Sequence, residues 1–202
     1  IDHVQSGEIF IDGKKDLPKS TRQAIDRGIA LVPEDRKTSG LFLENTIAFN
    51  MTITVMKEFI KGVFVDQRKE KSILDEYIGQ LEIKMADTEQ LAGELSGGNQ
   101  QKIVISKWLA AHPRILILDE PTRGVDVGAK SDIYHLICDI ARQGVAIILI
   151  SSELPEVMNM STRIGVMCEG QMVKIFEPDK EKVTQEIIMH YATGGFKHET
   201  YN

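Results

Sequence analysis

The sequence predicts an α/β fold in which parallel strands form a sheet and helices cover both of its faces. Three short, continuously apolar runs, at residues 29–32, 115–118 and 145–150, are typical of buried strands. Helical patterns lie between these runs, an alternation that favours a layered α/β structure. With 202 residues, 42% of them hydrophobic, the chain is long enough for one good core or two small ones.

The first elements are a strand, a short helix and a second strand. Residues 7–14 alternate apolar and polar side chains and close on an Asp-Gly turn, which predicts a strand of an antiparallel sheet with no obvious partner before it. Ser20 and Gln23 form a capping box for a short helix that Gly28 ends. The apolar run at residues 29–32 then predicts a buried strand that leads into a charged loop.

The middle of the chain has helical spacing and many charges, which predicts a helical subdomain. A new helix is expected to begin at Ser96, with apolar residues at core spacing, and to end before Pro113. Strands and helices alternate after it. The expected order is a strand at 115–118, a helix at 127–143, a strand at 145–150, a helix at 154–160, a hairpin of 163–168 with 171–176, and a helix at 183–192.

These patterns divide the chain into four parts. They are a core α/β part at 1–38, an α-helical subdomain at 39–112, a second core part at 113–195, and a polar tail at 196–202.

Composition excludes several classes of protein. The formal net charge of -6 argues against a general nucleic-acid binder, which would carry a basic stripe. The two cysteines and five histidines show no metal-ligand spacing, so reduced, buried cysteines are expected. The longest apolar run is too short to cross a bilayer and the first residues lack a signal-peptide profile. We expect a soluble, cytoplasmic protein.

Two motifs carry the chemistry. Ser96, Gly97 and Gly98 open a helix, where exposed backbone amides and the helix dipole can hold a phosphate. The apolar strand that follows ends in Asp119 and Glu120, which suit magnesium and water handling. The sequence has no G-x-x-x-x-G-K-[ST] loop, the phosphate cradle that such a strand needs to hold its own nucleotide. The two motifs together indicate part of an ATPase domain.

The motifs resemble the nucleotide-binding domain of ABC ATPases, a P-loop NTPase-like fold, along nearly the whole chain. The segments that carry this resemblance are Leu95-Ser96-Gly97-Gly98-Asn99-Gln100-Gln101-Lys102, Leu118-Asp119-Glu120-Pro121-Thr122 and Gly124-Val125-Asp126. Three segments, at residues 32–37, 99–102 and 151–156, are similar to the C-terminal ATP-binding half of the tandem ATPase subunit of bacterial ribose, galactose and xylose importers. In that interpretation the chain starts just after the Walker A region, so the antiparallel N-terminal part is missing.

The resemblance implies that two such domains pair head to tail, with ATP between the phosphate loop of one and the signature motif of the other. Ser96 would then bind the γ-phosphate of ATP held by the partner, helped by Gly97 and Gly98, with Asn99 and Gln100 also in the nucleotide-binding set. The alternative is a plain helix N-cap followed by a flexible turn.

The resemblance also implies roles for the strand end. Asp119 would orient the Mg²⁺ shell and Glu120 would position or deprotonate the attacking water, unless the two are merely solvated loop charges. Ser152 stands where most ABC domains have a histidine that holds the γ-phosphate, and Glu34 where most have a glutamine. Asp126 would contact the partner domain or cap the next helix. The replacements at Ser152 and Glu34 predict a degenerate nucleotide site.

The resulting hypothesis is a part of the ABC-type ATPase that couples ATP hydrolysis to sugar import, with ATP and Mg²⁺ as cofactors in the intact protein. The expected partners are the N-terminal ABC half of the same subunit, membrane permease subunits that dock near Glu34 and residues 35–45, and indirectly a sugar-binding protein. This places the protein on the cytoplasmic face of the bacterial inner membrane. The isolated chain is expected to be inactive and to self-associate. Alternatives are a soluble ABC protein acting on ribosomes or DNA, or a non-enzymatic docking module.

Overall fold

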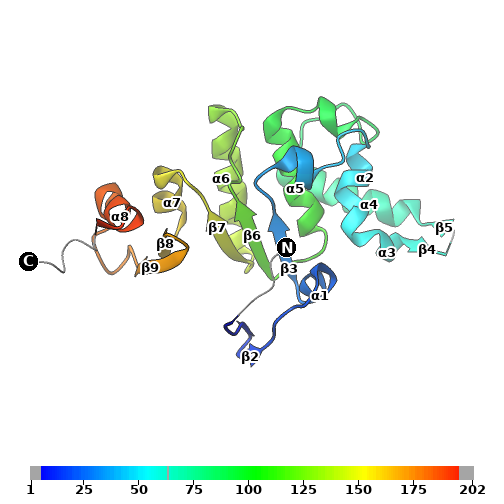
Figure 1. The fold of residues 1–202 in the computed structure, drawn as a ribbon. Coiled ribbons are helices and arrows are strands. Elements are labelled where there is room, and N and C mark those ends of the chain that lie inside the picture. The colour runs from blue at the N-terminus through cyan, green and yellow to red at the C-terminus, as the bar shows by residue number, and fades with distance from the viewer. Residues whose placement is uncertain (1–5, 63, 196–202) are drawn as a thin grey trace, which may run out of the picture.

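A three-stranded parallel sheet forms the centre of the molecule in the computed structural model, which describes residues 6–62 and 64–195 (Figure 1). Its strands are β3 (Ile29–Val32), β6 (Ile115–Asp119) and β7 (Ala146–Ile150), in the order β3-β6-β7. Both pairings are parallel, so the carboxyl ends of all three strands lie at one edge of the sheet. The predicted strands and α/β class are therefore confirmed.

One face of this sheet is covered by helices α5 (Gly97–Leu109) and α6 (Val127–Arg142). Val32 and Leu118 are fully buried and belong to the same hydrophobic cluster as residues of these helices. The other face carries Leu31, 47% exposed, and Ile148, 50% exposed. The prediction that both faces are covered is therefore wrong within the described residues, because apolar side chains occupy both faces but helices pack on one.

The N-terminal segment forms a hairpin and a short helix. Strands β1 (Phe10–Ile11) and β2 (Lys14–Lys15) pair antiparallel around the Asp-Gly turn. The turn is as predicted, but the strand is shorter than residues 7–14 and its partner follows it in the chain. Helix α1 (Thr21–Asp26) begins after Ser20, whose Oγ accepts a hydrogen bond from the Gln23 amide at 3.2 Å, as the capping box predicts.

The helical subdomain packs into the same hydrophobic cluster as the sheet. Its longest helices, α4 (Gln67–Leu81) and α5, follow the predicted apolar spacing. A short antiparallel hairpin interrupts the helical pattern and was not predicted. The elements are a π-helical turn Arg36–Gly40, α2 (Ile47–Thr52), a 3-10 turn Ile53–Val55, α3 (Met56–Phe59), β4 (Ile60–Lys61), β5 (Phe64–Val65), α4 (Gln67–Leu81), a 3-10 turn Ala92–Glu94 and α5.

The C-terminal elements build a second, smaller hydrophobic cluster around the buried side chains of Ile164, Val166, Phe176 and Ile188. The elements are α7 (Leu154–Met160), β8 (Ile164–Cys168), β9 (Gln171–Phe176) and α8 (Gln185–Ala192). Strands β8 and β9 form the predicted antiparallel hairpin, and α8 begins two residues later than predicted. The predicted tail at 196–202 lies outside the described residues.

Two expectations from composition can be compared with the fold. Cys168 is buried and Cys138 is half-buried, and neither forms a disulfide. Among the helices of the described ranges, none has the length and apolar character needed to span a membrane.

Candidate functional site: the signature turn and the strand ends

The turn that opens α5 presents free backbone donors. Ser96 is the N-cap, and its Oγ accepts a hydrogen bond from the Asn99 Nδ2 at 3.1 Å. The amides of Gly97 and Gly98 find no acceptor in the described part of the chain, as is usual for the first residues of a helix. These amides and the positive end of the helix dipole together suit an anion.

The two glycines of the turn are required by close packing within the protein itself. A Cβ on Gly97 would lie 2.8 Å from the Arg36 Nη2 and 2.8 Å from the Gly124 carbonyl oxygen. A Cβ on Gly98 would lie 2.9 Å from the Ala129 Cβ. The glycines therefore let the turn approach the loop that follows β6 and the first turn of α6.

Arg36 holds this contact together. The side chain is buried, with 9% of the residue exposed. Its Nη1 donates to the Arg123 carbonyl oxygen at 2.6 Å and its Nη2 to the Gly124 carbonyl oxygen at 2.9 Å. Its Nε donates to the Gln100 Oε1 at 3.4 Å. Sequence reasoning missed this residue, because backbone carbonyl acceptors leave no mark in a sequence.

Two residues of the predicted nucleotide-binding set are engaged inside the protein. Gln100 is buried, and its Nε2 donates to the Ala92 carbonyl oxygen at 3.3 Å while its Oε1 accepts from Arg36. The Gln100 side chain therefore fixes α5 in this structure, which differs from the predicted contact with nucleotide. The Asn99 Oδ1 accepts a hydrogen bond from the Lys84 amide at 2.9 Å, so Asn99 braces the turn from the other side.

Glu120 and Ser152 meet at the carboxyl edge of the sheet. The Glu120 Oε1 accepts a hydrogen bond from the Ser152 backbone amide at 2.7 Å. The Glu120 backbone has a φ of 47°, in the left-handed region, where the chain turns sharply after β6. Asp119 is the last residue of β6 and pairs in register with Ile150. The structure thus brings Asp119, Glu120 and Ser152 to one edge of the sheet.

The loop after β6 is anchored on two further sides. Thr122 is buried, and its Oγ1 donates to the Glu156 Oε1 at 3.1 Å. The other carboxylate oxygen of Glu156 is buried and has no hydrogen-bond partner among the described residues. Arg123 forms an exposed ion pair with Glu34. Sequence reasoning named Glu34 but missed Thr122, Arg123 and Glu156, whose partners lie far away in the chain.

Asp126 occupies the N-cap position of α6. Its carbonyl oxygen accepts from the amides of Ala129 and Lys130, at 2.9 and 3.0 Å, but its carboxylate makes no capping hydrogen bond. The N-cap alternative is therefore confirmed for the backbone. The predicted contact of the Asp126 carboxylate with a partner domain stays a prediction.

Hydrogen bonds shift the pKa values of two charged groups, one in the segment that follows Glu34 and one on α6. The hydroxyl of Thr38, together with the backbone amides of Thr38 and Lys37, lowers the pKa of the Asp35 carboxyl. The Glu153 carboxylate raises the pKa of the neighbouring Lys130. Each shift favours the charged form, which both groups already hold at neutral pH.

Magnesium fits the strand end only as a partly hydrated ion. No group of three or more His, Cys, Asp or Glu side chains in the described ranges could hold a metal by itself. Asp119 offers one carboxylate, and Mg²⁺ is commonly held by one or two carboxylates with water and substrate phosphates. The donor set therefore suits a metal that arrives with a nucleotide.

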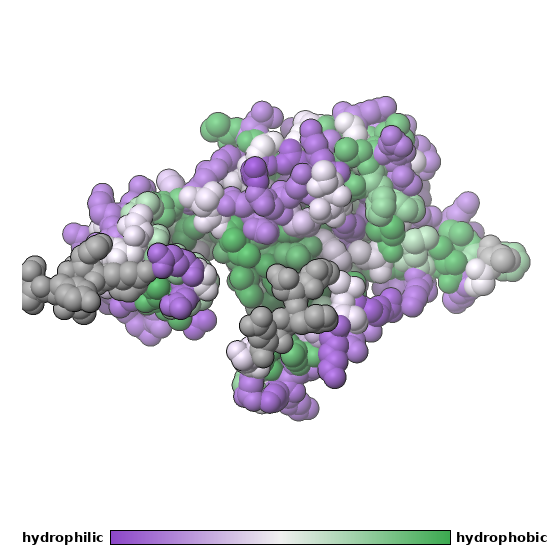
Figure 2. All heavy atoms as spheres, in the orientation of Figure 1, coloured by the Kyte–Doolittle hydropathy of each residue, from purple (hydrophilic) through white to green (hydrophobic). Residues whose placement is uncertain are grey.

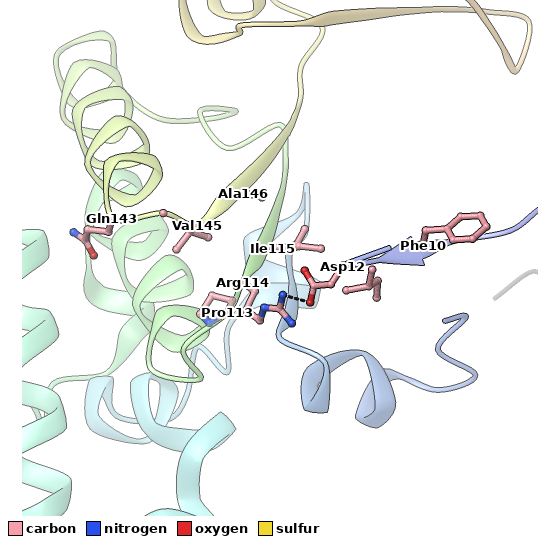
Figure 3. A pocket seen from close by; sticks show the side chains of 10 residues that line it. Phe10, Asp12, Pro113, Arg114, Ile115, Gln143, Val145 and Ala146 are labelled. Carbon is pink, nitrogen blue, oxygen red and sulfur yellow. Dashed lines mark hydrogen bonds and ion pairs between the residues drawn. The ribbon is translucent and has the colours of Figure 1, made fainter. Parts of the chain in front are cut away.

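A cleft of about 470 Å³ lies at the opposite edge of the sheet, where β6 and β7 begin (Figure 3). Ile115, Ala146 and Phe10 line it, and an ion pair between Asp12 and Arg114 crosses it. None of the predicted site residues lines this cleft. The candidate site is therefore a surface at the helix tip and the strand ends, and is separate from this cleft.

The arrangement is that of an ATP-binding cassette. A nucleotide-free cassette of an ABC transporter superimposes with a TM-score of 0.75 at 19% identity, covering 93% of this chain and 77% of that one. A cassette in its ADP conformation gives a TM-score of 0.73 at 20% identity, with 93% and 73% coverage. These likenesses establish the P-loop ABC ATPase fold.

The family model described as "ABC transporter" matches residues 1–123, and the chain belongs to this family. The chain is 51% identical over 195 residues, 96% of its length, to a ribose import ATP-binding protein RbsA of Halalkalibacterium halodurans. A putative ribose/galactose/methyl galactoside import ATP-binding protein of Rhizobium etli is 47% identical, also over 96% of the chain.

The chain spans only 39% of the Halalkalibacterium protein and 37% of the Rhizobium protein. The comparisons thus support an ABC ATPase domain similar to those of ribose importers. They do not support the narrower prediction of a C-terminal half that starts after a Walker A helix, which rested on the segments at 32–37, 99–102 and 151–156.

Proposed function

We propose that the chain is a nucleotide-binding cassette in the ATP-binding subunit of a bacterial importer for ribose or a related sugar, and that the subunit couples ATP hydrolysis to uptake. The relatives that support this are named as ribose import or ribose/galactose import ATP-binding proteins. The observation that carries the proposal is the signature turn, where the Gly97 and Gly98 amides are free and Ser96 caps the helix.

In this proposal the signature turn acts on a nucleotide held by another cassette of the same subunit. Ser96 and the two glycine amides bind the γ-phosphate, where fixed backbone donors stabilise the charge of the transferred group. The chain alone does not hydrolyse ATP, because its sequence has no phosphate loop.

The strand end would serve the cassette's own nucleotide. Asp119 would hold Mg²⁺, which neutralises phosphate charge when it is bound, and Glu120 would position the attacking water. The Ser152 hydroxyl is shorter than an imidazole and carries no charge, so this second site is proposed to be degenerate. The turn at Ser96 is then the part of the chain that matters for transport.

The proposal also assigns partners and location. Permease subunits dock near Glu34 and residues 35–45, and a sugar-binding protein delivers the sugar to them. The cassette is then peripheral to the cytoplasmic face of the inner membrane. The segment fits this role because Glu34 is exposed and paired with Arg123, on the loop that approaches the signature turn.

The experiment is Ser96→Arg in the full-length subunit, assembled with its permease. We expect loss of most ATPase activity and uptake, because the bulky side chain fills the position of the phosphate and covers the amides. Ser72→Arg is the matched control, since Ser72 is exposed on α4. Unchanged hydrolysis and uptake in the Ser96 variant would refute the role of the turn. Hydrolysis that persists without any permease or sugar dependence would favour a soluble ABC protein instead.

A further inference from the structure

Arg36 is a buried cation whose hydrogen-bond acceptors are all neutral. Its three acceptors are the side-chain oxygen of Gln100 and the carbonyl oxygens of Arg123 and Gly124. Among the residues that the structure describes, no carboxylate lies within ion-pair distance of its guanidinium. Burying a charge without a counterion lowers the stability of the fold. Packing alone therefore does not account for an arginine at this position.

The guanidinium joins three segments that are distant in sequence. Its own backbone begins the π-helical turn at 36–40, and its acceptors lie on α5 and on the loop after β6. The far end of the π-helical turn is also tied to α5, because the Lys107 Nζ donates to the Gly40 carbonyl oxygen. The turn is thus fixed to α5 at both ends, and the loop after β6 is fixed to it through Arg36.

The guanidinium also lies directly beside the signature turn. A Cβ on Gly97 would be 2.8 Å from the Arg36 Nη2. Its positive charge therefore adds to the positive end of the α5 dipole at the free amides of Gly97 and Gly98. Since both contributions favour a negative ligand, the turn has a second electrostatic source of affinity for a phosphate.

We propose that Arg36 is a positioning residue for the signature turn, which sets the turn against the loop after β6 and adds positive potential where the γ-phosphate binds. This inference rests on the proposed function. It assigns to Arg36 two separable properties. The planar fork donates to two carbonyl groups in a fixed geometry that the compact, rotatable ammonium of lysine does not reproduce, whereas lysine retains the positive charge.

The test uses the intact transporter in lipid vesicles, with ATPase kcat and KM measured for Arg36→Gln and Arg36→Lys. We expect Arg36→Gln to lower kcat/KM for ATP by about tenfold or more, the effect of losing charge-assisted hydrogen bonds. Arg36→Lys should recover part of the KM, because the charge remains, and little of the kcat. Amide hydrogen exchange should accelerate at 96–101 and 122–126 in both variants, because the fork is lost.

Arg22→Gln is the matched control, since Arg22 forms an exposed ion pair with Asp26 on α1 at 3.1 Å. Wild-type kinetics in Arg36→Lys or Arg36→Gln, or a lower unfolding temperature with unchanged kcat and KM, would overturn the proposal. Should Arg36→Gln fail to fold, Arg36→Lys decides by its kcat and exchange rates. If Ser96→Arg abolishes hydrolysis while the Arg36 variants behave as wild type, only this inference fails. If Ser96→Arg has no effect, the proposed function fails.

Discussion

At the scale of single residues, the packing of the site depends on glycine positions as well as on side chains. A Cβ on Gly97 would lie 2.8 Å from the Arg36 Nη2 and 2.8 Å from the Gly124 carbonyl oxygen, so a larger residue does not fit there without a shift. Gly128, on the first turn of α6, has nothing within 4 Å of the same position. The two glycines are therefore opposite cases, although both lie in the first turn of a helix.

Gly97→Ala is expected to lower the free energy of unfolding by about 1–3 kcal/mol, because one of the two close atoms belongs to the backbone and cannot rotate away. Gly128→Ala is expected to raise it by about 0.4–1 kcal/mol, because the substitution reduces the entropy of the unfolded chain without a clash. Urea unfolding of the full-length subunit measures both. Equal effects of the two substitutions would contradict the packing argument.

At the scale of elements, one hydrogen bond joins α4 to the end of α5. The Tyr77 hydroxyl donates to the Leu109 carbonyl oxygen at 3.0 Å, inside the hydrophobic cluster. Burial, with the carboxylates of Glu76 and Glu58 nearby, raises the pKa of Tyr77 to about 12. The hydroxyl therefore keeps its proton, and the hydrogen bond, at a pH where an exposed tyrosine would ionise.

The stabilisation that depends on this proton is complete below about pH 10, the ordinary tyrosine pKa, and is lost as pH rises through about 12. Tyr77→Phe should therefore lower the free energy of unfolding at pH 8 by about 0.5–1.5 kcal/mol, the net value of one hydrogen bond. The difference from wild type should shrink between pH 10 and 12. Tyr134→Phe, on α6, is the control. A difference that stays constant over this range would exclude the link to ionisation.

The elements were predictable where a local signal specifies them. The Ser-Gly-Gly start of α5 and the Asp-Gly and Glu-Gly turns carry strong local preferences, and the structure contains each of them. The β4-β5 hairpin was missed because two-residue strands give no periodicity within a helical pattern. The strands that end near Glu120 and Ser152 were predicted, whereas the Arg36 contacts depend on the three-dimensional path of two loops.

At the scale of the whole molecule, the described residues cover one face of the sheet only in part, and Figure 2 shows apolar surface at the centre of the view. Leu31, Ile117 and Ile148 are aligned across its three strands, and Ile150 adds a fourth apolar side chain that is 48% exposed. An exposed apolar face of this kind favours association, so the chain by itself should self-associate at this face.

Ile148→Lys should shift the chain toward monomer in light scattering over a range of concentrations, because a charge in the face must be desolvated on association. Met189→Lys, which replaces an exposed apolar residue of α8, should leave the association unchanged. A wild-type chain that stays monomeric at all concentrations would contradict the prediction, and an equal effect of the two substitutions would place the contact elsewhere.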